Sequence, residues 1–233
     1  MTSCVSIAPS YAPNTQNVTL FQEKGDAKLS AGLSRGEEVS KALELQSAYA
    51  ITNHIGIMAN FYRYKRVNRA DLFELGAGYF LPLTKNVVFE SYGGISYAQF
   101  TSRISSIEPL GNNEFLTKNY YYSRDFTRYF IQPAIGFKSK LIEIAFSTRL
   151  AALNYRRLKI SEDSYQNSSS LSSQMLPSSH FLIEPALTIR FGWNHIKLQA
   201  QLGRSFHLLG DSFPMEVWNA NIGAYFSLSK RDK

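Results

Sequence analysis

Residues 181–191 read Phe-Leu-Ile-Glu-Pro-Ala-Leu-Thr-Ile-Arg-Phe, and this stretch decides the fold. Its odd positions carry apolar or ring side chains, while its even positions include Glu184, Thr188 and Arg190. After Gly192-Trp193-Asn194 the alternation resumes as Ile-Lys-Leu-Gln-Ala-Gln-Leu-Gly over residues 196–203. A period of two over about ten residues indicates a β-strand with one apolar and one polar face.

The same alternation recurs along the chain, and no helical pattern separates its repeats. We expect ten strands, at residues 26–34, 41–51, 55–64, 71–81, 87–100, 127–138, 141–154, 180–192, 195–206 and 217–228. Such a series predicts an all-β fold, a ten-stranded antiparallel up-and-down transmembrane β-barrel. The chain then divides into an N-terminal periplasmic tether, residues 1–25, and the barrel, residues 26–230.

The connections between the expected strands alternate in length. Four are short, at residues 52–54, 82–86, 139–140 and 193–194. Five are longer, at residues 35–40, 65–70, 101–126, 155–179 and 207–216. Bacterial outer-membrane barrels have short periplasmic turns and longer extracellular loops. Because ten is an even number, we expect both termini in the periplasm.

A soluble, lipocalin-like barrel is the alternative, since alternation alone does not tell the inside of a barrel from the outside. Lipocalins have eight strands, and their connections do not separate by length in this way. The apolar face also continues across all ten expected strands. We therefore interpret the apolar face as the lipid-facing one and the polar face as the lumen.

Charged side chains recur on the expected lumenal face. They are Glu44, Glu74, Glu90, Glu143, Glu184, Arg149, Arg190 and Lys197. A barrel of this size has a narrow interior, and buried charges there must be paired and hydrogen-bonded. We expect a charge network that fills the lumen; a narrow path for ions or small solutes is the alternative interpretation.

The net charge of +7 in 233 residues falls mainly in expected loops, around residues 63–69 and 156–159. There it would meet anionic headgroups of outer-membrane lipid or lipopolysaccharide. We expect no nucleic acid as a partner, because no helix or aromatic platform accompanies the charge. We also expect no metal, because no histidine has a second ligand at useful spacing.

The single cysteine, Cys4, follows Met1-Thr2-Ser3. A small residue before a cysteine is typical of the end of a bacterial lipobox, so we expect a covalent lipid on Cys4 and no other cofactor. An incidental N-terminal thiol is the alternative. Residues 5–25 show little periodicity and contain Pro9 and Pro13, which favours a tether.

Two loop features suggest possible functions. Tyr120, Tyr121, Tyr122 and Arg124 form a cluster typical of protein interfaces, or alternatively of an upper aromatic girdle. His207, Asp211 and Ser212 share the last long loop, and His180 lies near the end of another. A rim-located lipid or peptide hydrolase would need such groups within hydrogen-bond reach of one another. We expect no enzyme here, because four histidines in loops meet acidic groups often by chance.

Three stretches carry a resemblance: residues 44–60, 74–79 and 129–137. They are similar to strands of outer-membrane β-barrel lipoproteins from the Bacteroidota, a largely uncharacterised group. The resemblance implies a lipidated barrel in the outer membrane and carries over no active site. The residues after Cys4 lack the acidic run of surface-exported lipoproteins, which implies a periplasmic anchor. Our functional hypothesis is a structural or accessory subunit that binds another outer-membrane protein.

Overall fold

The computed structural model describes residues 11–37, 41–65, 69–111, 114–163, 170–171, 179–193, 195–210 and 215–229, without the side chains of residues 65, 102–111, 114–122, 157–163 and 170–171. Its strands are β1 (Ala27–Arg35), β2 (Ala42–Ala50), β3 (Ile55–Lys65), β4 (Arg69–Pro82), β5 (Val87–Gly111), β6 (Glu114–Lys138), β7 (Ile142–Asp163), β8 (Ser170–Leu171), β9 (Ser179–Gly192), β10 (Ile196–Arg204), β11 (Phe206–Leu209) and β12 (Trp218–Leu228). None of the described residues forms a helix that could cross a membrane.

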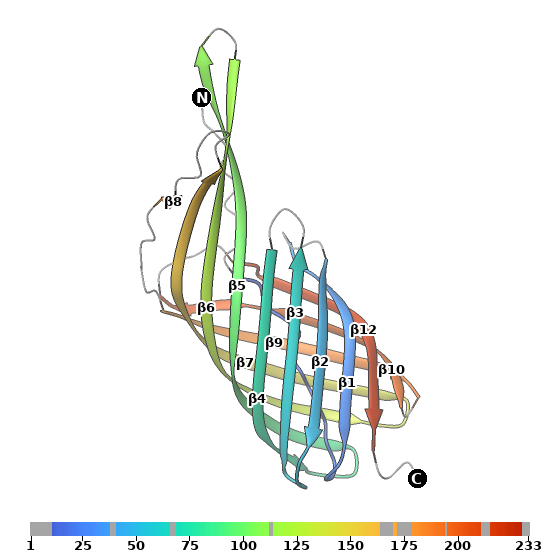
Figure 1. The fold of residues 1–233 in the computed structure, drawn as a ribbon. Coiled ribbons are helices and arrows are strands. Elements are labelled where there is room, and N and C mark those ends of the chain that lie inside the picture. Colours follow the sequence, from blue (N-terminus) through green and yellow to red (C-terminus); the bar gives the residue numbers. More distant parts are fainter. Residues whose placement is uncertain are drawn as a thin grey trace.

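Ten of these strands close into an antiparallel barrel, which confirms the predicted fold (Figure 1). Each strand pairs with its neighbours in the chain, and β1 pairs with β12 from Ala27 opposite Leu228 to Arg35 opposite Ala220. The two remaining strands are short additions. β11 continues β10 along β9 after an interruption at Ser205, and β8 pairs with β7 over two residues.

The expectation of a long connection at residues 101–126 is wrong. β5 and β6 instead continue as a ladder from Thr101 opposite Ser123 to Gly111 opposite Glu114. Figure 1 shows this two-stranded ribbon, with part of β7, rising beyond the rim of the barrel. The sequence pattern missed it because a ribbon outside the barrel has no face to bury and therefore needs no apolar alternation.

The barrel has two distinct ends. At the turn end, short turns at residues 51–54, 83–86, 139–141 and 193–195 join successive strands. Backbone hydrogen bonds close these turns. For example, Leu83 N donates to Val87 O at 2.8 Å, and Trp193 N donates to Ile196 O at 2.9 Å. The opposite end, from which β5, β6 and β7 continue, is called the extension end below. Strand β12 finishes at the turn end, where Ser227 N donates to His195 O at 2.9 Å.

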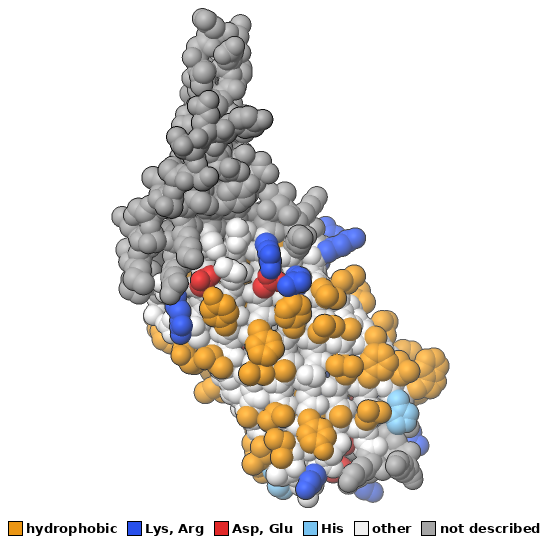
Figure 2. Space-filling view, in the orientation of Figure 1, with side chains coloured by type: hydrophobic (Ala, Val, Ile, Leu, Met, Phe, Trp, Pro, Cys, Tyr) orange, Lys and Arg blue, Asp and Glu red, His pale blue; other side chains and the backbone are white. Residues whose placement is uncertain are grey.

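The outer wall is apolar on every barrel strand. Exposed large side chains include Leu29, Leu45, Ile57, Phe73, Ile95, Ile131, Ile144, Ile189, Leu198 and Ile222. In Figure 2 such side chains form a belt across the face in view, with charged side chains along its upper border. An exposed apolar band of this kind is stable only against lipid, as in outer-membrane barrels.

Residues 11–21 lie inside the barrel and are buried throughout, so the expectation of a tether outside the barrel is wrong for them. We call residues 11–21 the lumen segment. It begins at the extension end, where Tyr11 O accepts from Glu216 N at 2.9 Å. It ends near the turn end, where the Phe21 and Phe80 rings lie 5.4 Å apart. The chain then reverses at Gly25, whose φ is 91°, and enters β1.

The domain boundary expected at residue 25 therefore does not separate two units, because the described residues before it pack inside the barrel. A segment without periodicity, such as residues 5–25, is typical of an exposed chain. The lumen segment instead places its polar groups against polar side chains of the wall, and an extended chain needs no alternation when it is buried on all sides.

Candidate functional site: a lumen filled by the N-terminal segment

The inward face of the barrel carries all eight charged residues that the alternation predicted there. None of the eight side chains Glu44, Glu74, Glu90, Glu143, Glu184, Arg149, Arg190 and Lys197 exposes more than 3% of its surface. The structure does not bring them into one network. It arranges six of them in two clusters and turns the other two carboxylates toward the lumen segment.

The first cluster lies toward the extension end. Arg128 contacts Glu74 at 2.5 Å, and Arg149 lies 3.5 Å from Glu74 and 3.6 Å from Glu184. Both guanidinium groups also donate to Asn14 Oδ1 of the lumen segment, at 2.6 and 2.9 Å. The cluster is therefore completed by a residue of the segment.

Arg128 is fully buried and was missing from the predicted network. Its position could have been inferred, because it lies four residues before Gln132 on the same strand and so shares its inward face. The strand predicted over residues 127–138 includes Arg128, but the inward face predicted for it starts only at Gln132.

The second cluster lies nearer the turn end. Glu143 accepts from Arg190 at 3.0 Å and from Lys197 at 2.8 Å. Arg190 also lies over the Tyr225 ring, 3.8 Å from its centroid, and donates to Val18 O at 2.6 Å. Its guanidinium thus joins the wall of the barrel to the backbone of the lumen segment.

Glu44 and Glu90 bind the backbone of the lumen segment. Glu44 accepts from Thr15 N at 2.8 Å and from the Ser34 hydroxyl. Glu90 accepts from Thr19 N and from Leu20 N, both at 2.8 Å. Both carboxyl groups are buried, and these hydrogen bonds make them points of attachment for the backbone of the segment.

The remaining backbone groups of the segment are held by neutral side chains. Gln201 accepts from Gln16 N at 2.7 Å and donates to Gln16 O at 2.8 Å, so that one amide group binds both polar atoms of one residue. Gln46 donates to Thr15 O at 2.8 Å, and Gln132 donates to Asn17 O at 3.0 Å. These side chains replace the neighbouring strand that an extended chain has in a sheet.

The wall is also shaped for the apolar end of the segment. A Cβ atom added at Gly136 would lie 2.5 Å from Leu20 Cδ2, and one added at Gly56 would lie 2.8 Å from Phe21 Cε2. Glycine therefore provides the space for both side chains. Leu20 has a φ of 46°, a left-handed conformation that costs a residue with a side chain about 1 kcal/mol. The contacts with Glu90 and Gly136 hold it there.

Tyr11 closes the lumen at the extension end. Its hydroxyl donates to Glu184 at 2.6 Å and accepts from Arg128 at 2.7 Å. Its ring lies 5.8 Å from the Phe126 ring, which stacks in turn on Phe100. From Tyr11 to Phe21, the segment thus fills the lumen with groups that match the wall.

The other predicted site residues lie at the extension end or outside the described residues. Tyr120, Tyr121 and Tyr122 belong to β6 rather than to a loop, and their side chains are not among those described. Arg124 is half-buried in the same strand, and its Cα is paired with Phe100. Cys4 lies outside the described residues.

The structure brings two of the predicted rim residues together. His180 Nδ1 lies 3.4 Å from His207 Nε2, and the His180 ring packs edge-on against Tyr155. Asp211 and Ser212 lie outside the described residues. Within the described part of the chain, no group of three or more metal-ligating side chains could hold an ion.

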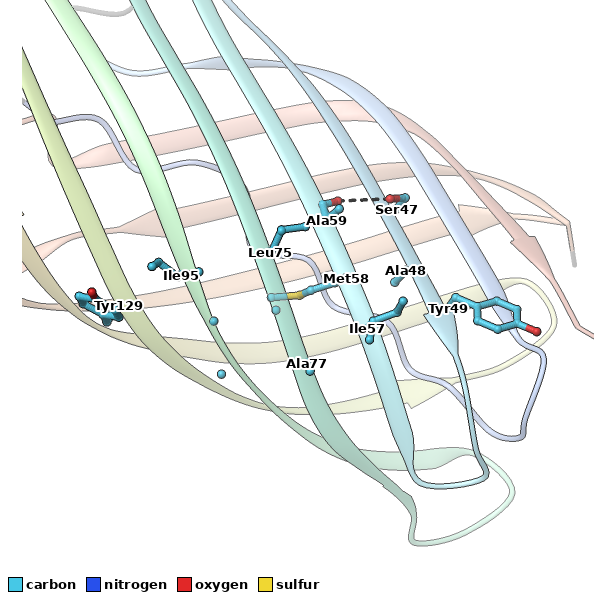
Figure 3. A pocket seen from close by; sticks show the side chains of 13 residues that line it. Ser47, Ala48, Tyr49, Ile57, Met58, Ala59, Leu75, Ala77, Ile95 and Tyr129 are labelled. Atoms are coloured by element: carbon cyan, nitrogen blue, oxygen red, sulfur yellow. Dashed lines mark hydrogen bonds between the residues drawn. The ribbon is translucent and has the colours of Figure 1, made fainter.

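A groove of about 770 Å³ is found on the outer wall rather than in the lumen. As Figure 3 shows, it crosses β2 to β6, where the small residues Ser47, Ala59 and Ala77 lie between Tyr49 and Tyr129. Because it lies within the apolar belt, lipid chains are its natural contents in a membrane. It is part of the lipid-facing surface.

Comparison with known proteins supports the fold. No family model matches this sequence, and no curated protein matches it. Among solved structures, the outer-membrane protease OmpT from Escherichia coli is similar, with a TM-score of 0.56 at 10% identity over 92% of this chain and 100% of that one. The translocator domain of the autotransporter NalP from Neisseria meningitidis has a TM-score of 0.52 at 11% identity, over 89% and 90%.

The chain therefore has the fold of bacterial outer-membrane β-barrel proteins. At this identity the likeness shows the fold alone, and a protease and a translocator domain share it. The resemblance to Bacteroidota lipoproteins and the lipid on Cys4 stay predictions.

Proposed function

We propose that the protein is an occluded outer-membrane barrel that acts as a structural or accessory subunit of a larger outer-membrane assembly. The observation that carries this proposal is the filled lumen. The lumen segment is buried from Tyr11 to Phe21, and wall side chains bind its backbone at several heights. A barrel built around its own chain offers its outer surfaces, rather than its interior, to other molecules.

The contacts favour a permanently occupied lumen over a narrow channel. If the segment left, the Glu44 and Glu90 carboxylates would lose the N–H groups of Thr15, Thr19 and Leu20. Withdrawal would also expose the buried side chains of Val18, Leu20 and Phe21 to water, at roughly 1.5–3 kcal/mol for each. Opening the lumen would therefore be strongly unfavourable.

The ribbon of β5 and β6 is the part of the barrel best suited to a protein partner. Strand β4 pairs with β5 only as far as Thr101, and among the described residues no other strand pairs with that edge of β5 from Ser102 to Gly111. An unpaired edge can receive a strand from another protein. We propose that the partner binds along this edge, next to the tyrosines at residues 120–122.

Lipid contacts complete the proposal. Arg63 and Arg69 pair with Asp71, both at 2.6 Å, near the extension end of β3 and β4. There they would meet anionic headgroups of outer-membrane lipid or lipopolysaccharide. A lipid on Cys4 would add a second attachment. We propose no catalytic role.

The proposal is tested by purification from outer membranes in mild detergent, followed by mass spectrometry. In the test variant, Asn-Gly replaces residues 104–120 and so shortens the ribbon. Asn-Gly favours a two-residue hairpin turn, which keeps Arg103 of β5 opposite Tyr121 of β6. We expect the native chain to bring down a stoichiometric outer-membrane protein and the shortened chain to lose it.

The control is Asn113→Gly, which lies between Gly111 and Glu114 and leaves the edge of β5 from Ser102 to Gly111 unchanged. It should retain the partner. Recovery of the native chain without any partner, or equal recovery with the shortened chain, would contradict the proposal.

A further inference from the structure

The described chain starts and finishes at opposite ends of the barrel. Tyr11 lies at the extension end, beside Glu216 and Met215 in the approach to β12. Strand β12 finishes at the turn end, where Ala27 pairs with Leu228. An even number of strands would place both ends of a barrel on one side. The lumen segment adds one further passage through the membrane and so reverses the side of everything that precedes it.

The contacts hold this passage at three levels. Tyr11 is bound by Arg128 and Glu184 at the extension end. Gln16 is bound by Gln201 at mid-height. Leu20 is bound by Glu90 toward the turn end.

The reversal into β1 is fixed as well. Gln22 N donates to Asp26 Oδ2 at 2.9 Å, and its side chain donates to Lys85 O at 2.7 Å in the β4–β5 turn. Gly25 N donates to Ala50 O at 2.9 Å. The segment therefore leaves the lumen at the turn end and cannot be an external strand folded back along the barrel.

We propose that the chain is threaded through its own barrel, so that the residues before Tyr11 emerge at the extension end, on the opposite face of the membrane from the C-terminus. With the short turns in the periplasm, the extension end faces the outside of the cell. The N-terminal residues would then be at the cell surface, which replaces the expectation that both termini are periplasmic.

This topology also changes where a lipid on Cys4 would be anchored. Six residues lie between Cys4 and Tyr11, and the seven steps of extended chain between these two residues span about 25 Å. Cys4 can therefore reach the lipid surface around the extension end. A lipid there would insert into the outer leaflet, rather than into the inner leaflet on the periplasmic side.

The test is labelling with a membrane-impermeant maleimide on intact cells and after permeabilisation of the outer membrane. The chain has one cysteine, so Cys4→Ala provides a background without thiols. Single cysteines are then introduced by Ser6→Cys before the lumen segment and by Ser229→Cys after β12. Two references define the ends: Glu37→Cys at the extension end and Lys85→Cys at the turn end, both at exposed positions.

We expect Ser6→Cys to react on intact cells together with Glu37→Cys. Ser229→Cys and Lys85→Cys should react only after permeabilisation. Labelling of Ser6→Cys on the same side as Lys85→Cys would overturn the proposal, whichever way the barrel is inserted.

A second measurement needs no cysteine and keeps Cys4. An epitope tag inserted between Ser6 and Ile7 should be removed by protease added to intact cells, while a tag after Lys233 should be protected. Protection of both tags, or loss of both, would overturn the proposal. Neither result bears on the accessory-subunit function, which depends on the partner and not on this topology.

Discussion

Single residues show how closely the wall fits the lumen segment. Gln201 binds both backbone atoms of Gln16, and Glu90 binds two successive N–H groups. The alternation of the sequence predicted that both side chains point inward, because residue parity alone decides the face. It did not predict what they bind, since their partners come from a stretch without periodicity.

Glu90 tests the attachment of the segment near the turn end. Replacing Glu90 with Ala leaves Thr19 N and Leu20 N without their acceptor, and each buried unsatisfied group costs about 1–3 kcal/mol. We expect the free energy of unfolding in detergent, measured with urea, to fall by roughly 2–4 kcal/mol. The neighbouring Ser91→Ala, on the outer face, should change it little; equal effects would contradict the role given to Glu90.

Gly136 tests the shape of the lumen. In Gly136→Ala the new methyl group would lie 2.5 Å from Leu20 Cδ2 and 2.9 Å from Ala145 Cβ. We expect a loss of stability of about 1–3 kcal/mol, since overpacking forces neighbours to move. The double variant Gly136→Ala with Leu20→Ala should lose less stability than the sum of the two single variants. The reason is that Leu20→Ala removes Cδ2, the atom that the new methyl group would meet.

The matched control for Gly136 is Gly93→Ala. The nearest atom to a Cβ there is Phe130 O at 3.7 Å, an ordinary contact. A loss at Gly93 as large as that at Gly136, or additive effects of Gly136→Ala and Leu20→Ala, would show that the segment does not occupy this space.

At the scale of elements, the ten barrel strands followed from the sequence and the ribbon did not. Strands within the membrane must be apolar outside and polar inside, so each carries a period of two. The parts of β5 after Thr101 and of β6 before Ser123 lie beyond the rim and face neither lipid nor lumen. Residues 102–108 of β5, Ser-Arg-Ile-Ser-Ser-Ile-Glu, accordingly show no period of two. The backbone ladder of β5 and β6 holds them together, and β7 pairs with β6 alongside it from Asn119 to Ser123.

Hydrogen exchange distinguishes these two parts of the same strands. A ribbon of two strands outside a barrel is marginally stable alone, whereas the barrel portions pair on both sides. We expect amides of β5 beyond Thr101 to exchange much faster than those of residues 88–100, with the protein in detergent and without a partner. Equal protection along β5 would contradict the view of the ribbon as a separate, partner-binding element.

For the whole molecule, the alternation in the sequence predicts the membrane and the barrel but not the content of the lumen. Outward-facing residues must be apolar because they contact lipid. Each strand therefore repeats the same alternating pattern, and the fold is predicted from many positions along the chain. The lumen segment occurs once and has no repeating pattern. Its residues, such as Asn14, Gln16 and Asn17, are equally common in exposed loops. Their role depends on partners far away in the sequence, such as Arg128 and Gln201.

The occluded lumen is the central claim, and single-channel recording in planar bilayers tests it most directly. We expect the purified native chain to insert without conductance steps, because residues 11–21 fill the passage. A variant lacking residues 11–21 should produce steps wherever it inserts, since only wall side chains then remain. Steady ion conduction by the native chain, at the level of the shortened one, would contradict the account.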